Sequence, residues 1–590
     1  MITKPIRLAC LILALAFCFC GCADLSGILN NDSGNEPGTT VEKEDLFASE
    51  DIHIRDKNLL YENQNNTEIV TMYLTVSYGN AAENTNHTWE EINTYSAYDY
   101  EDMGVERYQI AGLLQIGDEN GEIGSEYGSG QLAPNCTVQI RGQSSSSNVQ
   151  KNYKISIKDN KGDWRGQQTI ALNKHQGDGL RFRNKLGFDL LSGIDELISL
   201  RTTFVRLYVK DTTAGPDAKF EDYGIYTQVE QLNKTALERH GLDKRGHLYK
   251  VNLCEFYRYE DVIVLKNDPA YDVAAFEEIL EIKGDDDHSK LIRLLERIND
   301  YSIPIETILE ENFDIENFAY WMAFQILVGN VDTQNRNFYL YSPLNSERFY
   351  ILSWDLDAMF KRSEYALIGR SDYSEWENGV SNYWGNILFR RCLKSDVFRE
   401  ALDAAVESIY TKLLDGRLET YVQTYSQLLK PLLYVGKDAL YMPLTEAKYD
   451  TVVSALVDEL KSNYENYKLS YDKPMPFFIG TPTLVDGKLS LVWDVSYSFD
   501  VESITYTFEL ARDYSFADPI VKETGLELPR VTLDALPAGQ YFIRIFACDE
   551  GGDTQTAFDY YVTENGKVYG TKCFYVDEQG QIVEDVYVEE

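Results

Sequence analysis

The hydrophobic pattern of this 590-residue chain changes its period twice, and this order constrains the fold more than any other feature. Strand-like runs come first, at 69–76, 136–141, 153–158, 204–210 and 224–229. Apolar residues at three- and four-residue spacing then predict helices at 274–282, 289–298, 315–327, 397–414, 418–434 and 445–467. A strand-rich half followed by a helical half predicts an α+β fold with two lobes.

The pattern returns to short alternating strands after residue 473. They are predicted at 489–495, 504–510, 531–536, 541–547 and 557–562, with Asp486-Gly487 at a hairpin turn. Trp493 in an early strand and Tyr541 after Leu536-Pro-Ala-Gly-Gln resemble a fibronectin type III module. We therefore predict a small all-β sandwich over 475–565, followed by an acidic tail or edge strand over 566–590.

The first 22 residues have the pattern of a targeting segment. Lys4 and Arg7 precede an apolar run that is too short to span a membrane. The run ends in Phe19-Cys-Gly-Cys22, which resembles a bacterial lipobox and makes Cys22 the expected lipidation site. An ordinary signal peptide or a plain N-terminal anchor is the alternative. Residues 23–60 have the composition of a flexible linker. We expect an extracytoplasmic protein held on the bacterial cell membrane only by its lipid.

The charge of the chain argues against anionic macromolecules as partners. Asp and Glu number 95 against 55 Lys and Arg, which gives a formal net charge of −40. Such a surface repels phosphate backbones, so we expect no nucleic-acid partner. No C-x-x-C pair occurs after the targeting segment, which argues against structural zinc. The sequence leaves open whether Cys548 and Cys573 form a disulfide.

A polar segment follows the helix predicted up to Leu327, and it carries the most informative side chains. Asp332 and Asn337 lie in a loop, and a hairpin predicted after them ends in Asp355 and Asp357. Carboxylate and amide oxygens in this order are the ligands that Mg²⁺ prefers. Protein kinases use the same order, although the His-Arg pair before the first Asp and the D-F-G sequence are absent here.

Basic residues gather around a serine-rich turn between two predicted strands. Backbone N–H groups and hydroxyls on such a turn can approach phosphates, with a lysine as counter-charge. In so acidic a chain these residues indicate an anion-binding site, and a solvated edge strand is the alternative. The basic residues are Arg141, Lys151, Lys154, Lys158 and Lys161.

Four segments in this order resemble the CotH kinase family of atypical bacterial and fungal kinases. The similarity spans about residues 66–470, and we assign 61–470 to a kinase-like domain. The segments are Arg141-Gly-Gln-Ser-Ser with Lys151-Asn-Tyr-Lys154, Leu180 to Leu186, Gly224 to Lys234 with Leu248-Tyr-Lys250, and Gly329 to Tyr339 with Trp354 to Asp357.

The resemblance implies an atypical two-lobed protein-kinase-like fold that transfers phosphate from ATP to Ser or Thr of a secreted or surface protein. Asp332 resembles the catalytic base of the family. Asn337, Asp355 and Asp357 resemble its ligands for Mg²⁺ or Mn²⁺.

The resemblance also implies a nucleotide site. Lys151 resembles the lysine that contacts phosphate, and Lys154 competes with it because its place on the strand is better defined. The remaining expected ATP contacts are Arg141, Ser144 and Ser145 over the phosphates, with Glu230 and Gln231 as the hinge that meets adenine.

A non-catalytic surface scaffold that binds matrix or cell-wall polymer through its sandwich is the alternative function. A glycan hydrolase is less favoured, because Asp355 and Asp357 on one strand would share a face and could not flank a sugar. Trp376 and Trp384 follow the carboxylates and either line an acceptor groove or pack in the core.

Overall fold

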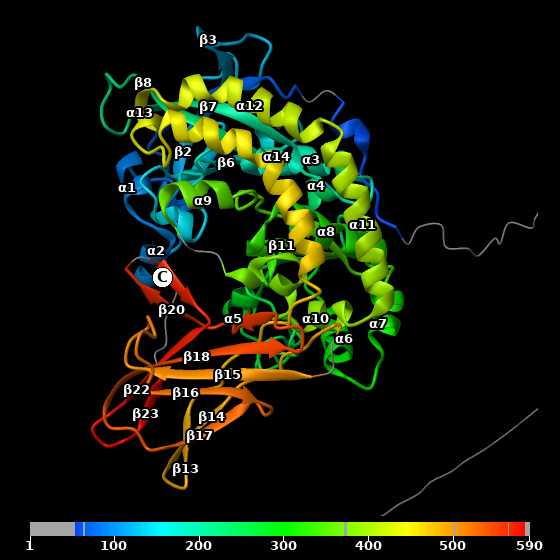
Figure 1. Ribbon diagram of the computed structural model, residues 1–590. Coiled ribbons are helices and arrows are strands. Elements are labelled where there is room, and N and C mark those ends of the chain that lie inside the picture. The colour runs from blue at the N-terminus through cyan, green and yellow to red at the C-terminus, as the bar shows by residue number, and fades with distance from the viewer. Residues whose placement is uncertain (1–52, 63–64, 371–373, 501–502, 565, 585–590) are drawn as a thin grey trace, which may run out of the picture. The chain divides into compact units, whose positions relative to one another are not determined.

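The computed structural model describes residues 53–62, 65–370, 374–500, 503–564 and 566–584 (Figure 1). The predicted targeting segment, with Cys22, and the linker up to residue 52 lie outside the described residues. The predicted linker extends too far, because residues from His53 onward pack on the body. Ile54 is buried, and its N–H donates to Asp314 Oδ2 at 3.2 Å.

The strand-rich first half forms one mixed sheet in the order β1-β7-β8-β6-β5-β4-β2-β3. Because β1 also pairs with β2, seven of these strands close on themselves. Val138, Ile140, Tyr153 and Ile155 alternate into one enclosed apolar core. The strands are β1 (Ile69–Ser77), β2 (Ile110–Asp118), β3 (Gly121–Glu122), β4 (Cys136–Arg141), β5 (Asn152–Ile157), β6 (Thr169–Asn173), β7 (Thr202–Asp211) and β8 (Phe220–Glu230).

Four short helices accompany this sheet. They are α1 (Trp89–Thr94), α2 (Ala97–Met103), α3 (Arg183–Leu191) and α4 (Lys234–Arg239). Every residue of α3 is buried, so this helix belongs to the core and not to the surface.

A smaller sheet begins the second half of the body, in the order β10-β9-β11-β12. Its strands are β9 (His247–Val251), β10 (Leu280–Ile282), β11 (Phe338–Ser342) and β12 (Tyr350–Ser353). β11 and β12 form the predicted hairpin, with Phe338 opposite Ser353. The helix predicted up to residue 282 ends at Ile279, because Leu280 to Ile282 pair with β9 instead.

Helices make up the rest of the body, and α8 lies at its centre. Because α8 is apolar on nearly all sides, it is buried, and it packs against α11 and α14. α12 and α13 reach back to β8 of the first sheet (Figure 1). The helices are α5 (Val273–Ile279), α6 (Ser289–Asn299), α7 (Ile305–Asn312), α8 (Ile315–Val328), α9 (Arg362–Ile368), α10 (Ile387–Leu393), α11 (Asp396–Leu414), α12 (Arg417–Leu433), α13 (Gly436–Ala439) and α14 (Glu446–Leu469).

The C-terminal strands, coloured orange to red in Figure 1, form the predicted β-sandwich. One sheet has the order β13-β14-β17 and the other β16-β15-β18-β22-β23, with β19 on β18 and a separate β20–β21 hairpin. The strands are β13 (Thr483–Val485), β14 (Lys488–Val492), β15 (Ile504–Ala511), β16 (Val521–Leu526), β17 (Arg530–Asp534), β18 (Gly539–Asp549), β19 (Thr554–Thr556), β20 (Tyr560–Thr563), β21 (Gly566–Tyr569), β22 (Thr571–Val576) and β23 (Ile582–Glu584).

Two sequence signals of the sandwich have clear structural roles. Trp493 is 3% exposed in its core, and the hydroxyl of Tyr541 donates to the carbonyl of Pro537 at 2.6 Å, as in a tyrosine corner. The predicted boundary at residue 565 is too early, because β22 pairs along β18 and buries Phe574. Of the residues predicted as a tail or edge strand, β23 lies at the edge of this sheet, whereas β22 lies inside it.

Two further observations complete the fold. Cys548 and Cys573 are not joined by a disulfide. Within the described residues, no helix has the length and apolarity needed to cross a membrane. The fold is α+β, with a β-sandwich at its C-terminal end.

Candidate active site

The loop that carries Asp332 starts at a rigid helix end. α8 ends at Gly329, whose φ of +63° is a left-handed conformation that glycine adopts without strain. The next residue, Asn330, donates through Nδ2 to Gln325 Oε1 at 2.9 Å. The short 3₁₀ turn Val331–Thr333 follows and leaves Asp332 exposed.

Asn337 contacts Asp332 directly, five residues further along the same loop. Its Nδ2 lies 2.7 Å from Asp332 Oδ2 and 3.2 Å from the Asp332 carbonyl oxygen. Asn337 has a φ of +61°, which is uncommon for a residue with a side chain, and its N–H donates to Val251 O at 3.2 Å. Because the amide nitrogen faces Asp332, the amide oxygen of Asn337 is the atom left for a cation.

Asp355 leaves β12 in an unusual conformation and in an acidic environment. Its φ is +53°, a strained backbone geometry that clusters at functional sites. Burial raises the pKa of Asp355 to about 7, and the negative charges of Asp357 and Asp332 add to this effect. The charges of His175 and Arg141 oppose it. A carboxyl group whose ionisation is opposed by burial and by acidic neighbours gains stability from a bound cation.

The donor set fits a magnesium ion that arrives with a nucleotide. The carboxylates of Asp332, Asp355 and Asp357 do not all lie within 4.8 Å of one another, so these three do not form a closed cage. Mg²⁺ in kinases takes one or two carboxylates and completes its shell with waters and substrate phosphates. Asp355, Asp357 and the amide oxygen of Asn337 can supply these protein ligands.

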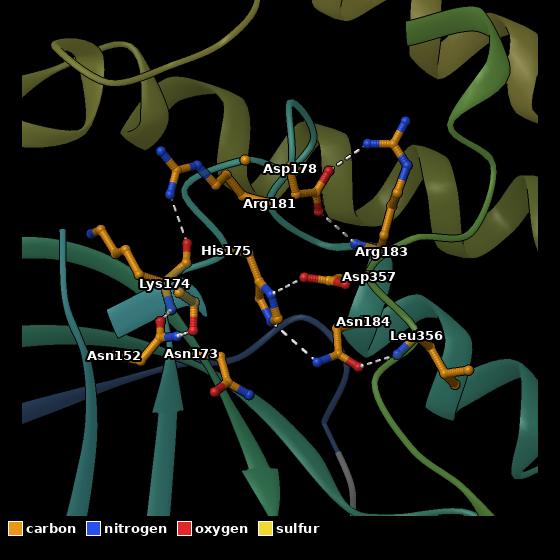
Figure 2. Close-up of polar contacts among 12 residues, drawn as sticks. Asn152, Asn173, Lys174, His175, Asp178, Arg181, Arg183, Asn184, Leu356 and Asp357 are labelled. Carbon is orange, nitrogen blue, oxygen red and sulfur yellow. Dashed lines mark hydrogen bonds and ion pairs between the residues drawn. The ribbon is translucent and has the colours of Figure 1, made fainter. Parts of the chain in front are cut away.

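His175 fixes the second carboxylate, although the sequence predicts no role for it. Figure 2 shows its imidazole between Asp357 and Asn184. His175 Nδ1 lies 2.9 Å from Asp357 Oδ2, and Asn184 Nδ2 lies 3.2 Å from His175 Nε2. Asn184 Oδ1 also accepts the N–H of Leu356 at 3.1 Å. The pair therefore orients both the backbone and a side chain of the carboxylate segment.

A buried cluster around Arg183 holds the chain just beyond these carboxylates. The Arg183 guanidinium contacts Asp178 (Figure 2). It also contacts Glu364 Oε2 at 2.5 Å and the carbonyl of Phe360 at 2.9 Å. Arg183 is the largest favourable charge on Asp178 and keeps the pKa of this buried carboxyl below its usual value. Because Phe360 and Glu364 follow Asp357, Arg183 joins this segment to α3.

Positive charge reaches the acids from both sheets of the body. Arg141, at the end of β4, contacts Asn173 and stabilises the charged form of Asp355. Burial lowers the pKa of Lys250, on β9, whereas the negative charges of Glu281 and Asp355 stabilise its charged form. Lys250 belongs to one of the four family-like segments, but its role was missed because nothing in the sequence relates β9 to β4.

The ammonium of Lys151 is already bound within the serine turn. Lys151 is 7% exposed, and its Nζ donates to the carbonyl of Ser146 at 2.6 Å, which closes the serine turn. Lys154 lies near Arg141, and burial together with nearby positive charge lowers its pKa. Because the Lys151 ammonium has a partner in the turn, Lys154 and Lys250 are the other candidates for a phosphate contact, and the choice among the three lysines stays a prediction.

One of the two serines expected to contact ATP already has a hydrogen-bond partner in the turn. Ser144 is exposed, whereas Ser145 Oγ accepts a hydrogen bond from Asn152 Nδ2 at 2.9 Å. Gly142, with a φ of +90°, lets the chain turn where an added Cβ would lie 2.1 Å from Ser145 Oγ. The contacts of Ser144 and Ser145 with ATP stay predictions.

The side chain of Glu230 is not available to adenine. Its two oxygens are bound by Arg201 and by His240 Nε2, the latter at 3.1 Å. Burial opposes its ionisation, but these partners outweigh burial and lower the pKa of Glu230 to about 2. Gln231 is half-buried, and its Nε2 finds no hydrogen-bond partner in the described part of the chain. Its contact with adenine stays a prediction.

Comparison with known proteins gives a family match over more than half of the chain. Residues 138–467 match the family described as CotH kinase protein. Inner spore coat protein H of Bacillus subtilis (strain 168) is 23% identical over 269 residues, which cover 44% of this chain and 68% of that protein.

Two of the solved structures that resemble this chain have low TM-scores. The Helicobacter pylori proinflammatory kinase CtkA has a TM-score of 0.23 at 11% identity, over 54% of this chain and 95% of its own. The HipA–HipB toxin–antitoxin complex of Shewanella oneidensis has a TM-score of 0.23 at 12% identity, over 51% of this chain. The match covers 58% of the Shewanella chain, less than two thirds of its length.

Proposed function

The chain belongs to the CotH kinase family, and from this premise we propose that it is an extracytoplasmic protein kinase. It would transfer the γ-phosphoryl group of ATP to a Ser or Thr hydroxyl of a secreted or surface protein. The observation that carries the proposal is the 2.7 Å contact between Asp332 and Asn337. Asp355 lies near enough to Asp332 that, after burial and the charge of Asp357, the charge of Asp332 also raises its pKa.

The residues of the chain divide the chemistry as follows. Asp332 accepts the proton of the acceptor hydroxyl as its oxygen forms a bond to the γ-phosphorus. The bond from the γ-phosphorus to the bridging oxygen breaks, and ADP leaves with that oxygen. Arg141, Lys154 and Lys250 offset the charge of the phosphates. Asn337, Asp355 and Asp357 would hold Mg²⁺, which neutralises the charge that develops on the phosphate oxygens.

The proposed location depends on the N-terminal segment. Cleavage before Cys22 and lipidation of its thiol would attach the chain to the outer side of the cell membrane. The acceptor would then be a protein outside the cytoplasm. Mass spectrometry of the N-terminal peptide from the native membrane fraction tests this, because a diacylglyceryl group on Cys22 is expected.

The kinase proposal is tested with the full chain purified in detergent. Mg²⁺ and ATP together should raise the melting temperature, and labelled phosphate from γ-labelled ATP should appear on the chain or on an added protein. Asp332→Asn should abolish the label, whereas the same change at the exposed Asp458 of α14 should not. A chain that neither binds MgATP nor transfers label would instead support the alternative of a non-catalytic scaffold that binds matrix or cell-wall polymer.

A further inference from the structure

A cavity of about 580 Å³ lies beside Asp332, between the kinase-like body and the sandwich. The body contributes Asp332, Gln334 and Trp376 to its lining, and the β20–β21 hairpin contributes Tyr560, Val562 and Tyr569. We call this cavity the hairpin groove. Its size falls within the range of about 300–1,000 Å³ that is typical of ligand sites.

Direct contacts fix the hairpin at this position. The ring of Trp376 meets Phe558 edge to face with centroids 5.0 Å apart, and meets Tyr569 at 5.7 Å. The Tyr569 hydroxyl donates to Glu377 Oε1 at 3.2 Å. Tyr569 is in turn paired with Tyr560 across the hairpin. The wall of the groove that faces the catalytic loop is therefore built by the C-terminal module.

A second set of contacts packs the sandwich against the body. Trp384 stacks on Tyr497 with centroids 5.1 Å apart, and Lys394 Nζ lies 4.7 Å from the centroid of the same tyrosine ring. Met475, in the link to the sandwich, is fully buried in the core of the body. An apolar interface of this kind resists the relative motion that is usual between domains. Trp384 is thus a core residue, whereas Trp376 both packs and lines the groove.

We propose that the hairpin groove binds the acceptor protein, so that the C-terminal module selects the substrate of the kinase. The proposal rests on the proposed function, because it takes Asp332 as the group that receives the acceptor proton. A general base must lie within about 2.6–3.2 Å of the hydroxyl that it deprotonates, or reach it through one water. The chain on either side of the acceptor Ser or Thr must then pass through the space next to Asp332.

The chemistry of the wall defines the substrate class. Tyr560, Tyr569, Trp376 and Val562 offer rings and a branched side chain, and burial of apolar surface against them favours binding. Arg336, Arg370 and Lys567 also line the groove and add basic groups beside this apolar part. Aromatic pairs gain further from edge-to-face contact. The preferred acceptor is therefore an extended protein segment with an aromatic or large aliphatic side chain close to its Ser or Thr.

The experiment uses the full chain and a peptide library with a fixed central Ser or Thr and random flanking positions. The wild-type chain should enrich aromatic or large aliphatic residues at one flanking position at least fivefold. Tyr560→Ala and Val562→Ser should reduce this enrichment at least threefold. Val562→Trp, which fills the groove, should raise the KM for a selected peptide at least tenfold without changing the KM for ATP.

Matched controls come from the same module. Val492 is 49% exposed on β14 and does not line the groove, so Val492→Ser and Val492→Trp should behave as wild type. Each variant is first compared by its melting temperature and by its stabilisation with MgATP. A variant that loses both is misfolded, and the remaining groove variants then decide the question.

The outcomes separate the two proposals. A chain that shows no stabilisation by MgATP contradicts the kinase itself. A chain that binds MgATP but phosphorylates no library peptide contradicts the acceptor groove. The same holds if flanking preferences are absent, or if they persist unchanged in Tyr560→Ala and Val562→Trp. If an oligosaccharide binds in the groove and no peptide competes with it, the groove binds a glycan and the acceptor proposal is wrong.

Discussion

His175 Nδ1 lies 2.9 Å from Asp357 Oδ2, so an imidazole from the strand-rich half of the body orients a carboxylate from the helical half. The two residues are 182 positions apart in the sequence. Asn184, which contacts His175 Nε2, also accepts the N–H of Leu356 between the two carboxylates. Partners of this kind around metal ligands are worth about 10–100-fold in metal affinity.

His175→Ala should therefore weaken Mg²⁺-dependent ATP binding by about 10–100-fold, because Asp357 loses the group that orients it. Calorimetric titration of ATP at several Mg²⁺ concentrations measures the effect. His53→Ala, a change at a histidine whose side chain is 44% exposed, is the control and should not change the titration. Equal titrations for His175→Ala and wild type would contradict a positioning role.

Asp332→Asn should reduce phosphoryl transfer by about 10²–10⁴-fold, the range for a lost general base. Asn retains the shape of the side chain and its contact with Asn337 but accepts no proton. Binding of MgATP should stay within about twofold of wild type, measured by the same titration. An equal loss of binding and transfer would mean that Asp332 acts in nucleotide binding rather than in proton transfer.

Asp355→Asn should stabilise the metal-free chain at pH 8 while abolishing the effect of Mg²⁺. The pKa of Asp355 rises from the ordinary 3.8 to about 7 in the fold, mainly because of burial. The folded chain therefore holds this proton more tightly, and ionisation costs stability as the pH rises from about 4 to 7. The amide removes that cost above pH 7 and has little effect near pH 4.

Thermal melting of both chains at pH 4.5 and pH 8, each with and without MgATP, tests this prediction. The melting temperature of Asp355→Asn should exceed that of wild type only at pH 8 and only without metal. A lower melting temperature at pH 8 would mean that the charge of Asp355 is already neutralised by the protein.

Lys250→Met and Lys154→Met should each raise the KM for ATP more than Lys151→Met does. The charge of Asp355 acts on Lys250, and the charge of Arg141 acts on Lys154. The Lys151 ammonium is instead bound to the Ser146 carbonyl. A lysine that contacts a phosphate contributes roughly the 1.5–3 kcal/mol of a charged hydrogen bond, or about 10–100-fold. A larger effect from Lys151→Met would restore the role that the family resemblance assigns to it.

His240→Gln should remove a pH-dependent part of the stability. Hydrogen bonds to Asp56 Oδ1 at 2.6 Å and Glu230 Oε2 at 3.1 Å outweigh burial and raise the pKa of His240 to about 9. The stabilisation is complete below the ordinary pKa of 6.5 and is lost as the pH rises to about 9. A shift of this size corresponds to roughly 3 kcal/mol.

Urea unfolding of wild type and His240→Gln at pH 6, 7.5 and 9.5 provides the measurement. The difference in free energy of unfolding should be largest at pH 6 and smallest at pH 9.5. A difference that does not vary with pH would show that His240 is neutral in the fold.

Local sequence determined about half of the individual elements. The strand over residues 136–141 and the helix that starts at residue 289 follow from apolar periodicity, which depends only on neighbouring residues. The contact between Asp332 and Asn337 is also local, because a single loop joins them. The turn at Asp486-Gly487 likewise depends only on two residues that tolerate a positive φ, here +50° and +75°.

Tertiary structure alone decided the partners of the site. Residues 280–282 have helical periodicity but pair as a strand with β9, because the exposed edge of that strand offers backbone hydrogen bonds. Glu230 has a position suited to a hinge, yet its carboxylate is taken by Arg201 and His240. Similarly, Lys151 and Lys154 lie three residues apart, and only their surroundings in the fold separate their roles.

The sequence by itself thus determined many of the strands and helices, and it indicated the acids of the candidate site. The fold decided that His175, Lys250 and the β20–β21 hairpin belong beside them. The physical reason is distance along the chain. Periodicity and spacing record contacts between neighbours, whereas the electrostatics of Asp355 and the wall of the groove come from segments that only packing brings together.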